Sequence, residues 1–364
     1  MNVADLNARL PDPAIWSGKR VLLTGHTGFK GAWLTLWLER LGARVTGLSL
    51  APEAGSLGDL LHLERRVDSH TIDIRDAEQT RGAIREAAPE IIIHMAAQAL
   101  VRASYADPLG TFATNTMGTA HVLDAARTVP SVRAVLAVTT DKVYENREWP
   151  HPYRESDALG GHDPYSASKA GAELVAASWR RAFLEPAGVA VATARAGNVI
   201  GGGDFAPDRL VPDCIRAFAA DQPVRIRNPA ATRPWQHVLD PLAGYLLLAE
   251  SLLSGPEAAQ AQASRAWNFG PSIENVATVG EVVARLSQAW GGTATWSADP
   301  GPHPHEAGLL SVDASLARHE LGWRPRLMLA NAIETTVAWY RHQLAGRDPA
   351  ALIHADIDHY EAPK

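Results

Sequence analysis

Two groups of side chains in this sequence could carry acid–base chemistry. Tyr165 and Lys169 stand four residues apart in DPYSASKAGAELV. On a helix they would share one face, where an ammonium lowers the pKa of a phenol and makes it a usable base near neutral pH. Thr140, Asp141 and Lys142 stand together in VTTDKVYEN and add a hydroxyl, an acid and a base. The alternative is a chance pair on a helix, an aspartate that caps a turn and a solvated lysine.

Three equally spaced glycines predict a phosphate-binding loop. Gly25, Gly28 and Gly31 lie in RVLLTGHTGFKGAWLTLWLERLG, between an apolar run and an amphipathic run. A strand that ends at Thr24 must turn at once into a helix. Glycine permits both this tight turn and the close approach of a phosphate to the helix N-terminus. Inside a helix Gly31 costs about 1 kcal/mol relative to alanine, so we expect it to allow close packing of the helix on the strand.

Short β-rich runs alternate with longer helical patterns through the first half of the chain. Their mostly continuous apolar character is typical of strands that are buried on both faces of a parallel sheet. The strand runs are RVLLTG, ARVTGLSL, SHTIDI, EIIIHMAA, AVLAVTT and VAVATARAG, and the clearest helical stretches are residues 29–41, 108–126 and 166–183. This alternation predicts an α/β fold with a doubly wound parallel (Rossmann) sheet.

The pattern loosens from about Asn198, where the glycine-rich NVIGGGDF is followed by proline-punctuated loops and separated helices. We therefore expect a dinucleotide-binding Rossmann domain at residues 1–197 and mainly a smaller substrate-binding domain at residues 198–364. A later segment near residues 235–270 is expected to return to the first domain.

Composition narrows the possible partners. The chain has 364 residues, of which 46% are hydrophobic and 20% charged, and its formal net charge is -6. Nothing in it marks a nucleic-acid-binding or membrane-binding surface, so we expect a small-molecule substrate or another protein chain as partner. The N-terminal MNVADLNARLPDP lacks an apolar core, which leads us to expect a cytoplasmic protein.

Cysteine and histidine usage argues against disulfides and metals. The single cysteine, Cys214, excludes an intrachain disulfide and is expected to be a buried packing residue. His303, His305 and Glu306 in HPHEA superficially resemble a metal site. Prolines interrupt this run and no further ligands cluster there, so we expect no metal.

The glycine spacing G-x-x-G-x-x-G, together with Tyr165 and Lys169, resembles the extended short-chain dehydrogenase/reductase superfamily. This resemblance implies NAD as the cofactor. The second strand itself leaves NAD and NADP open, because Ser49 stands where an acidic residue would bind the ribose 2′-hydroxyl and no arginine replaces it. The cofactor-binding residues that the resemblance implies are Gly25, Thr27, Gly28, Phe29, Lys30, Gly31, Asp73, Ile74, Ala96, Ala97, Gln98, Asn115, Tyr165 and Lys169.

Thr140, Asp141 and Lys142 resemble an acid–base addition found in the nucleotide-sugar 4,6-dehydratases of that superfamily. Most of these have glutamate in place of Lys142, whereas Thr-Asp-Lys is similar to the branch that acts on CDP-glucose. Further stretches that resemble this branch are GHTGFKGAWLTLWL, YRESDALGGHDPYSASK and RPWQHVLDPL, and the similarity spans roughly residues 16–340.

The resemblance implies a dehydration with internal hydride transfer from sugar C4 to C6. Tyr165 would take the proton of the C4 hydroxyl and Thr140 would bind the C4 oxygen. Lys142 would remove the C5 proton, and Asp141 would protonate the departing C6 hydroxyl. The expected substrate-binding residues are Asn198, Arg209, Arg233 and His237.

The assembly and the competing functions follow from the same resemblance. It implies a homodimer, or a dimer of dimers, that pairs the helices of residues 108–126 and 166–183. It also implies a deoxysugar product of the kind used in lipopolysaccharide. The alternatives are a dehydratase for another nucleotide, a 4-epimerase, and a non-catalytic protein that senses NAD. A sensor needs none of the acid–base side chains, and the residues alone do not distinguish cytosine from uracil, guanine or thymine.

Overall fold

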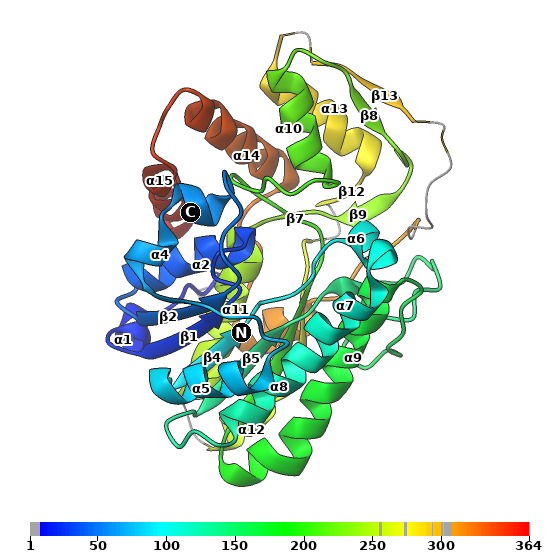
Figure 1. Cartoon of the computed structure of the whole chain (residues 1–364). Coiled ribbons are helices and arrows are strands. Elements are labelled where there is room, and N and C mark those ends of the chain that lie inside the picture. Colours follow the sequence, from blue (N-terminus) through cyan, green and yellow to red (C-terminus); the bar gives the residue numbers. More distant parts are fainter. Residues whose placement is uncertain are drawn as a thin grey trace.

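A seven-stranded parallel sheet forms the centre of the protein (Figure 1). The computed structural model describes residues 8–254, 257–272, 275–292, 294–299, 301 and 308–363. In sheet order the strands are β11 (Ala266–Phe269), β6 (Ala190–Ala196), β5 (Ala134–Val138), β4 (Ile91–His94), β1 (Arg20–Thr24), β2 (Arg44–Ser49) and β3 (Asp68–Thr71). All neighbouring strands in this order pair in parallel. The predicted doubly wound sheet is confirmed.

Helices cover both faces of this sheet. Val21 and Leu23 of β1 lie in the larger apolar core with α2 and α11, whereas Leu22 points into the smaller core with α5 and α8. The helices are α1 (Pro13–Trp16), α2 (Phe29–Arg40), α3 (Leu57–Leu60), α4 (Leu63–Arg66), α5 (Ala77–Ala87), α6 (Val101–Ala106), α7 (Pro108–Phe112), α8 (Gly118–Ala126), α9 (Pro164–Trp179), α10 (Leu210–Ala219), α11 (Leu239–Leu253), α12 (Glu257–Ala263), α13 (Val279–Trp290), α14 (Leu329–Leu344) and α15 (Pro349–Glu361). Since alternate strand residues face opposite cores, both faces of the sheet are buried.

Short helical turns extend or link these helices. A π-helical turn, η2 (Ala113–Met117), joins α7 to α8, so residues 108–126 form the continuous helical segment that the sequence predicts. The other turns are η3 (Asp141–Val143), η4 (Arg180–Leu184), η5 (Glu185–Ala187) and η7 (Ala317–Leu321).

The second half of the chain builds a smaller unit beyond the carboxyl ends of the strands. Figure 1 places α10, α13 and α14 at the top of the view, away from α5 and α8. Its short strands pair as β7 (Val199–Ile200) with β10 (Gln236–His237), β8 (Val224–Ile226) with β13 (Trp296–Ala298), and β9 (Thr232–Pro234) with β12 (Val276–Thr278). An ion pair of 2.7 Å between Arg102, on α6 just past β4, and Asp208 joins the two units.

Parts of the second half return to the sheet. β11 pairs with β6 through Ala266 and Thr193, and α11 packs on the same face as α2. Farther along the chain, α15 packs on α2, where Glu361 accepts hydrogen bonds from Trp37 and Arg40 at 2.9 and 3.0 Å. The boundary proposed at residue 198 therefore follows β6, and residues beyond it contribute to both units.

The structure also bears on the cysteine, on possible metal ligands and on membrane-crossing helices. Cys214 is fully buried in α10, and this burial raises the pKa of its thiol to about 12. Within the described ranges no group of three or more His, Cys, Asp or Glu side chains could hold a metal ion. His303, His305 and Glu306 lie outside those ranges. Among the described helices, none has both the length and the apolar character needed to cross a membrane.

Candidate active site

The turn from β1 into α2 depends on close backbone contacts. A Cβ on Gly25, whose φ is +73°, would lie 2.7 Å from the backbone nitrogen of Ala96, and one on Gly31 would lie 2.1 Å from the carbonyl oxygen of Gly25. Gly28 is the N-cap of α2, which begins at Phe29, and it offers no side chain to cap the helix. The first backbone N–H groups of α2 are therefore available to an anion, which suits a pyrophosphate.

The other predicted cofactor residues follow β2 and β3. The Thr27 hydroxyl hydrogen-bonds to the Ser49 hydroxyl at 2.7 Å, which ties the glycine loop to the end of β2. The Asp73 carboxylate accepts hydrogen bonds from the guanidinium and the backbone N–H of Arg75, which hold the pKa of Asp73 below its usual value. Ile74 is buried against α8 in the smaller core.

Asn115, which the resemblance assigns to the cofactor, makes side-chain hydrogen bonds to other parts of the chain. Its side chain is fully buried in the π-helical turn η2, where it donates to the Gln98 carbonyl at 3.0 Å and to the Ser168 hydroxyl at 2.9 Å. It also accepts from the Gln98 backbone N–H at 2.9 Å. Both amide hydrogens are thus used within the protein, so Asn115 connects the end of β4 to α9. Ala96, Ala97 and Gln98 remain partly exposed at that strand end.

Tyr165 and Lys169 share one face of α9, as their spacing predicts. Asp163 caps this helix and Pro164 occupies its first position. The two side chains are nearly buried, with exposed fractions of 8% for Tyr165 and 6% for Lys169. The Lys169 ammonium donates to the carbonyl of Val138 at 3.1 Å, at the end of β5.

Burial shifts the pKa values of both Tyr165 and Lys169. Burial raises the pKa of Tyr165 to about 12, although a hydrogen bond with Thr140 acts in the opposite direction. Burial and the nearby charge of Lys30 together lower the pKa of Lys169 to about 7. The Lys169 ammonium is directed at Val138, and its expected effect on the phenol when NAD and substrate are bound stays a prediction.

The turn after β5 places the second acid–base group beside Tyr165. The Thr140 hydroxyl donates to Oδ1 of Asp141 at 3.0 Å, and the Lys142 ammonium lies 3.8 Å from the same oxygen. Asp141 is fully buried and its Oδ2 has no partner among the described residues, whereas the Lys142 side chain is 26% exposed. A Cβ on Gly197 would lie 2.8 Å from that Oδ2, so glycine is needed there.

Lys30, which belongs to the glycine loop, also lies near Tyr245 and close enough to Asp141 for their charges to interact. Its ammonium lies 5.7 Å from the ring centre of Tyr245 on α11. Burial lowers the pKa of Lys30 to about 8; the charge of Arg209 lowers it further, and the charge of Asp141 acts in the opposite direction. Tyr245 is fully buried with no described partner for its hydroxyl. The sequence did not indicate Tyr245 as a site residue, because Tyr245 stands in an apolar helix.

The predicted substrate residues lie around the second unit. Arg209 forms an ion pair of 2.9 Å with Asp204, and Arg233 donates to the carbonyl of Thr232 at 2.9 Å. Oδ1 of Asn198 is buried without a partner among the described residues. His237 is fully buried, and burial lowers its pKa to about 3. The side chain of His237 therefore touches no space that a substrate could enter in this conformation.

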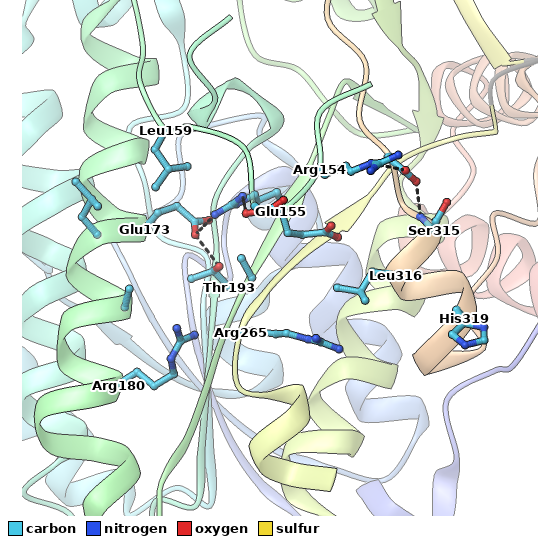
Figure 2. A pocket seen from close by; sticks show the side chains of 16 residues that line it. Arg154, Glu155, Leu159, Glu173, Arg180, Thr193, Arg265, Ser315, Leu316 and His319 are labelled. Atoms are coloured by element: carbon cyan, nitrogen blue, oxygen red, sulfur yellow. Dashed lines mark hydrogen bonds and ion pairs between the residues drawn. The ribbon is translucent and has the colours of Figure 1, made fainter. Parts of the chain in front are cut away.

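A separate cavity of about 820 Å³ lies between α9, β6 and the segment around η7 (Figure 2). Glu173, Thr193 and Arg195 are among its lining residues, and its rim carries Arg180, Arg265 and His319. None of the predicted catalytic, cofactor-binding or substrate-binding residues lines it. The cavity thus lies apart from the cluster around Tyr165 and Asp141, but Glu173 connects the two regions.

The chain is similar to known nucleotide-sugar enzymes along nearly its whole length. A family model described as GDP-mannose 4,6 dehydratase matches residues 22–336. The CDP-glucose 4,6-dehydratase of Salmonella typhimurium strain LT2 is 48% identical over 355 residues, which cover 96% of this chain and 98% of the relative. A dTDP-glucose 4,6-dehydratase of Xanthomonas campestris is 28% identical over 340 residues, covering 88% and 92%. The structure resembles dTDP-glucose 4,6-dehydratase from Streptomyces venezuelae, solved with NAD and TYD bound, with a TM-score of 0.75, 27% identity and coverage of 91% and 99%.

Burial of Lys169 can be tested without any reaction. Because its folded pKa is about 7 and its usual value is 10.5, the unfolded chain binds more protons between these pH values. The free energy of unfolding should therefore rise from pH 7 to pH 9, and Lys169 should supply about 2 kcal/mol of that rise. Urea denaturation of the protein without added cofactor should give a rise smaller by this amount in Lys169→Met. The surface variant Lys19→Met should keep the full rise; equal rises in Lys169→Met and the parent would contradict the buried position.

Proposed function

The chain belongs to the GDP-mannose 4,6 dehydratase family, and on that premise we propose that it converts CDP-D-glucose to CDP-4-keto-6-deoxy-D-glucose. It is an NAD-dependent nucleotide-sugar 4,6-dehydratase, a hydro-lyase of the extended short-chain dehydrogenase/reductase superfamily. The observation that carries the proposal is the cluster of three buried side chains, Tyr165, Thr140 and Asp141, with the partly exposed Lys142 beside them. This cluster stands in a chain that matches a CDP-glucose 4,6-dehydratase from end to end.

The glycine loop and the N-terminus of α2 fit the pyrophosphate of NAD. We propose that the backbone N–H groups at Phe29 and Lys30 hold it, with Ala96 and Ala97 beside the nicotinamide half and Asp73 and Ile74 beside the adenine. When bound, NAD accepts a hydride from sugar C4 and returns it to C6.

Oxidation at C4 requires a base for the hydroxyl proton. Tyr165 is the proposed base, and Thr140, with which it shares a hydrogen bond, would also bind the C4 oxygen. The protein's own groups leave the pKa of Tyr165 at about 12, so the phenolate must gain stabilisation when the ligands bind. The positive charge of oxidised nicotinamide has the sign that this requires.

Elimination across C5 and C6 requires a neutral amine and a protonated carboxyl group. We propose that Lys142 removes the C5 proton and that Asp141 protonates the departing C6 hydroxyl. The two side chains lie 3.8 Å apart, and transfer of one proton from the ammonium to the carboxylate, once they approach to hydrogen-bonding distance, would give both reactive forms with no change in net charge. Neither a 4-epimerase nor an NAD-sensing protein needs such a pair.

The second unit would hold the nucleotide. We propose that Asn198, Arg209 and Arg233 bind the substrate, since the planar guanidinium of arginine donates hydrogen bonds in pairs to phosphate oxygens. Arg209 would then exchange its contact with Asp204 for the diphosphate. We also propose His237 for substrate binding, since its fully buried Nε2 has no hydrogen-bond partner among the described residues.

We further propose that two copies pair through the helices at residues 108–126 and 166–183, with α6 beside them. Exposed apolar side chains gather on α6, α7, η2, α9 and η4, elements that pack against one another in sequence order. They are Tyr105, Leu109, Phe112, Met117, Leu174 and Phe183. Such a face fits a self-complementary twofold interface.

We also propose that the enzyme is cytoplasmic and that its product is used to make the deoxysugars of lipopolysaccharide.

Replacing Lys142 should separate the two halves of the reaction. In Lys142→Met, single-turnover absorbance with CDP-glucose should still report cofactor reduction, because Tyr165 is intact. Elimination and solvent-deuterium exchange at C5 should slow by ~10²–10⁴-fold. Tyr165→Phe should block the first reduction, and Lys19→Met, which removes a surface amine paired with Glu90, should change neither step. If Lys142→Met exchanged the C5 proton and released product at the parent rate, Lys142 would not be the C5 base and another residue would have that role.

The dimer can be tested by charge placed on its proposed surface. Sedimentation at micromolar concentration should give a dimer or larger for the parent chain and a monomer for Leu109→Arg, because Leu109 is the most exposed of the apolar side chains on that surface, at 83%. Leu344→Arg is a matched control on α14, where the leucine is 58% exposed, and it should leave the assembly unchanged. A monomeric parent chain would contradict the proposal.

A further inference from the structure

A buried ion pair lies behind the proposed catalytic turn. The Arg195 guanidinium of β6 contacts Oε2 of Glu173 on α9 at 2.8 Å, and the two side chains have exposed fractions of only 4% and 3%. Removing one partner of such a pair leaves an uncompensated charge in the interior, so the two groups are expected to act together. Neither residue belongs to the proposed acid–base set.

The glutamate end of the pair holds the start of the turn. Oε1 of Glu173 accepts a hydrogen bond from the Thr139 hydroxyl at 2.5 Å, and Oε2 also accepts one from the Thr193 hydroxyl at 2.8 Å. Figure 2 shows the Glu173 side chain leaving α9 and pointing toward Thr193 on the sheet. Thr139 directly precedes Thr140, so this contact fixes the chain one residue before the catalytic hydroxyl.

The arginine end holds the other side of the same turn. Nη1 of Arg195 donates to the Tyr144 hydroxyl at 2.9 Å, and its guanidinium carbon lies 5.0 Å from the centre of the Tyr144 ring. The Tyr144 hydroxyl in turn donates to Oδ1 of Asn268 at 2.6 Å. Tyr144 follows Lys142 by two residues, so the segment 139–144 is anchored at both ends by the two members of one ion pair.

We propose that Glu173 and Arg195 are positioning residues that hold Thr140, Asp141 and Lys142 in register with Tyr165. The proposal rests on the proposed function, because the reaction gives these three side chains their roles. Helix α9 carries both Tyr165 and Glu173, two turns apart on one face, and the ion pair therefore links the C4 base to the C5–C6 acid and base.

This geometry has a specific kinetic consequence. The pair contacts no proposed ligand-binding residue in the second unit, so its loss should leave substrate binding nearly intact. It should instead misplace the reacting groups, and misplacement by about 1 Å can cost about 10²-fold in rate. A loss of kcat with KM almost unchanged is the pattern expected of a group that matters only for the transition state.

The experiment compares Glu173→Gln with a buried glutamate elsewhere. Glu250 is 1% exposed and accepts hydrogen bonds from the Asp12 backbone N–H and the Trp16 indole, far along α11 from the catalytic turn. Glu173→Gln should lower kcat for CDP-glucose by about 10²-fold with KM within about twofold, whereas Glu250→Gln should change neither beyond about twofold. Both should be assayed well below their melting temperatures.

Hydrogen exchange gives a readout that does not depend on turnover. In the full chain, backbone amides of residues 139–144 should exchange faster in Glu173→Gln than in the parent, as measured by mass spectrometry, and at the parent rate in Glu250→Gln. Thr139→Val removes only the hydroxyl contact with Glu173 at nearly constant volume, so it tests the same link if Glu173→Gln does not fold. Thr139→Ser, which keeps the hydroxyl, should restore both kcat and protection.

The outcomes separate this proposal from the assigned reaction. Unchanged kcat in Glu173→Gln and Thr139→Val, or a loss of kcat with parent-like exchange at residues 139–144, would overturn the positioning role. If the parent chain does not dehydrate CDP-glucose, the assigned reaction fails, whatever the exchange experiment gives. If the parent is active and both Thr139→Val and Glu173→Gln lose kcat and local protection together, the positioning role stands.

Discussion

Burial of the Asp141 carboxylate at the carboxyl end of β5 is the constraint on which the site depends. A buried charged group is costly unless nearby groups pair with it. Here Thr140 and Lys142 approach one oxygen, while the other has no partner among the described residues and lies where only a glycine, Gly197, fits behind it. The surrounding contacts reduce the free-energy cost of burying this carboxylate and leave its second oxygen available to a ligand.

Positive charge is concentrated around this carboxylate. Lys30, Lys169 and Arg209 are close enough for their charges to affect one another or Asp141, and burial lowers the pKa of both lysines. Repulsion among these cations would be offset by an anionic diphosphate, which is the charge that a nucleotide sugar brings. The electrostatics of the site therefore agree with the substrate class inferred from the family.

Local sequence patterns predicted much of the fold. AVLAVTT and EIIIHMAA are continuous apolar runs because β5 and β4 are covered on both faces, and the structure places strands within both. The spacing of Tyr165 and Lys169 also specified their shared helix face. These features depend on residues that are near in sequence, and for that reason a single sequence reveals them.

The features that the sequence did not reveal are contacts between distant segments. The packing of α15 on α2 joins Trp37 to Glu361, 324 positions away, and the pairing of Glu173 with Arg195 depends on how α9 crosses β6. The resemblance assigns Asn115 to the cofactor, and the structure adds its contacts with Gln98 and Ser168, which the sequence did not indicate. The burial that raises the pKa of Tyr165 was not visible in the sequence either, because burial is a property of the whole fold.

The central claim is an internal hydride transfer from C4 to C6 of CDP-glucose. The most direct measurement uses CDP-glucose that carries deuterium at C4, with catalytic amounts of NAD, and locates the label in the product by nuclear magnetic resonance. The account predicts deuterium at C6 of CDP-4-keto-6-deoxyglucose and no net accumulation of NADH. Stoichiometric growth of NADH absorbance, or a product whose C6 methyl carries no label from C4, would contradict it.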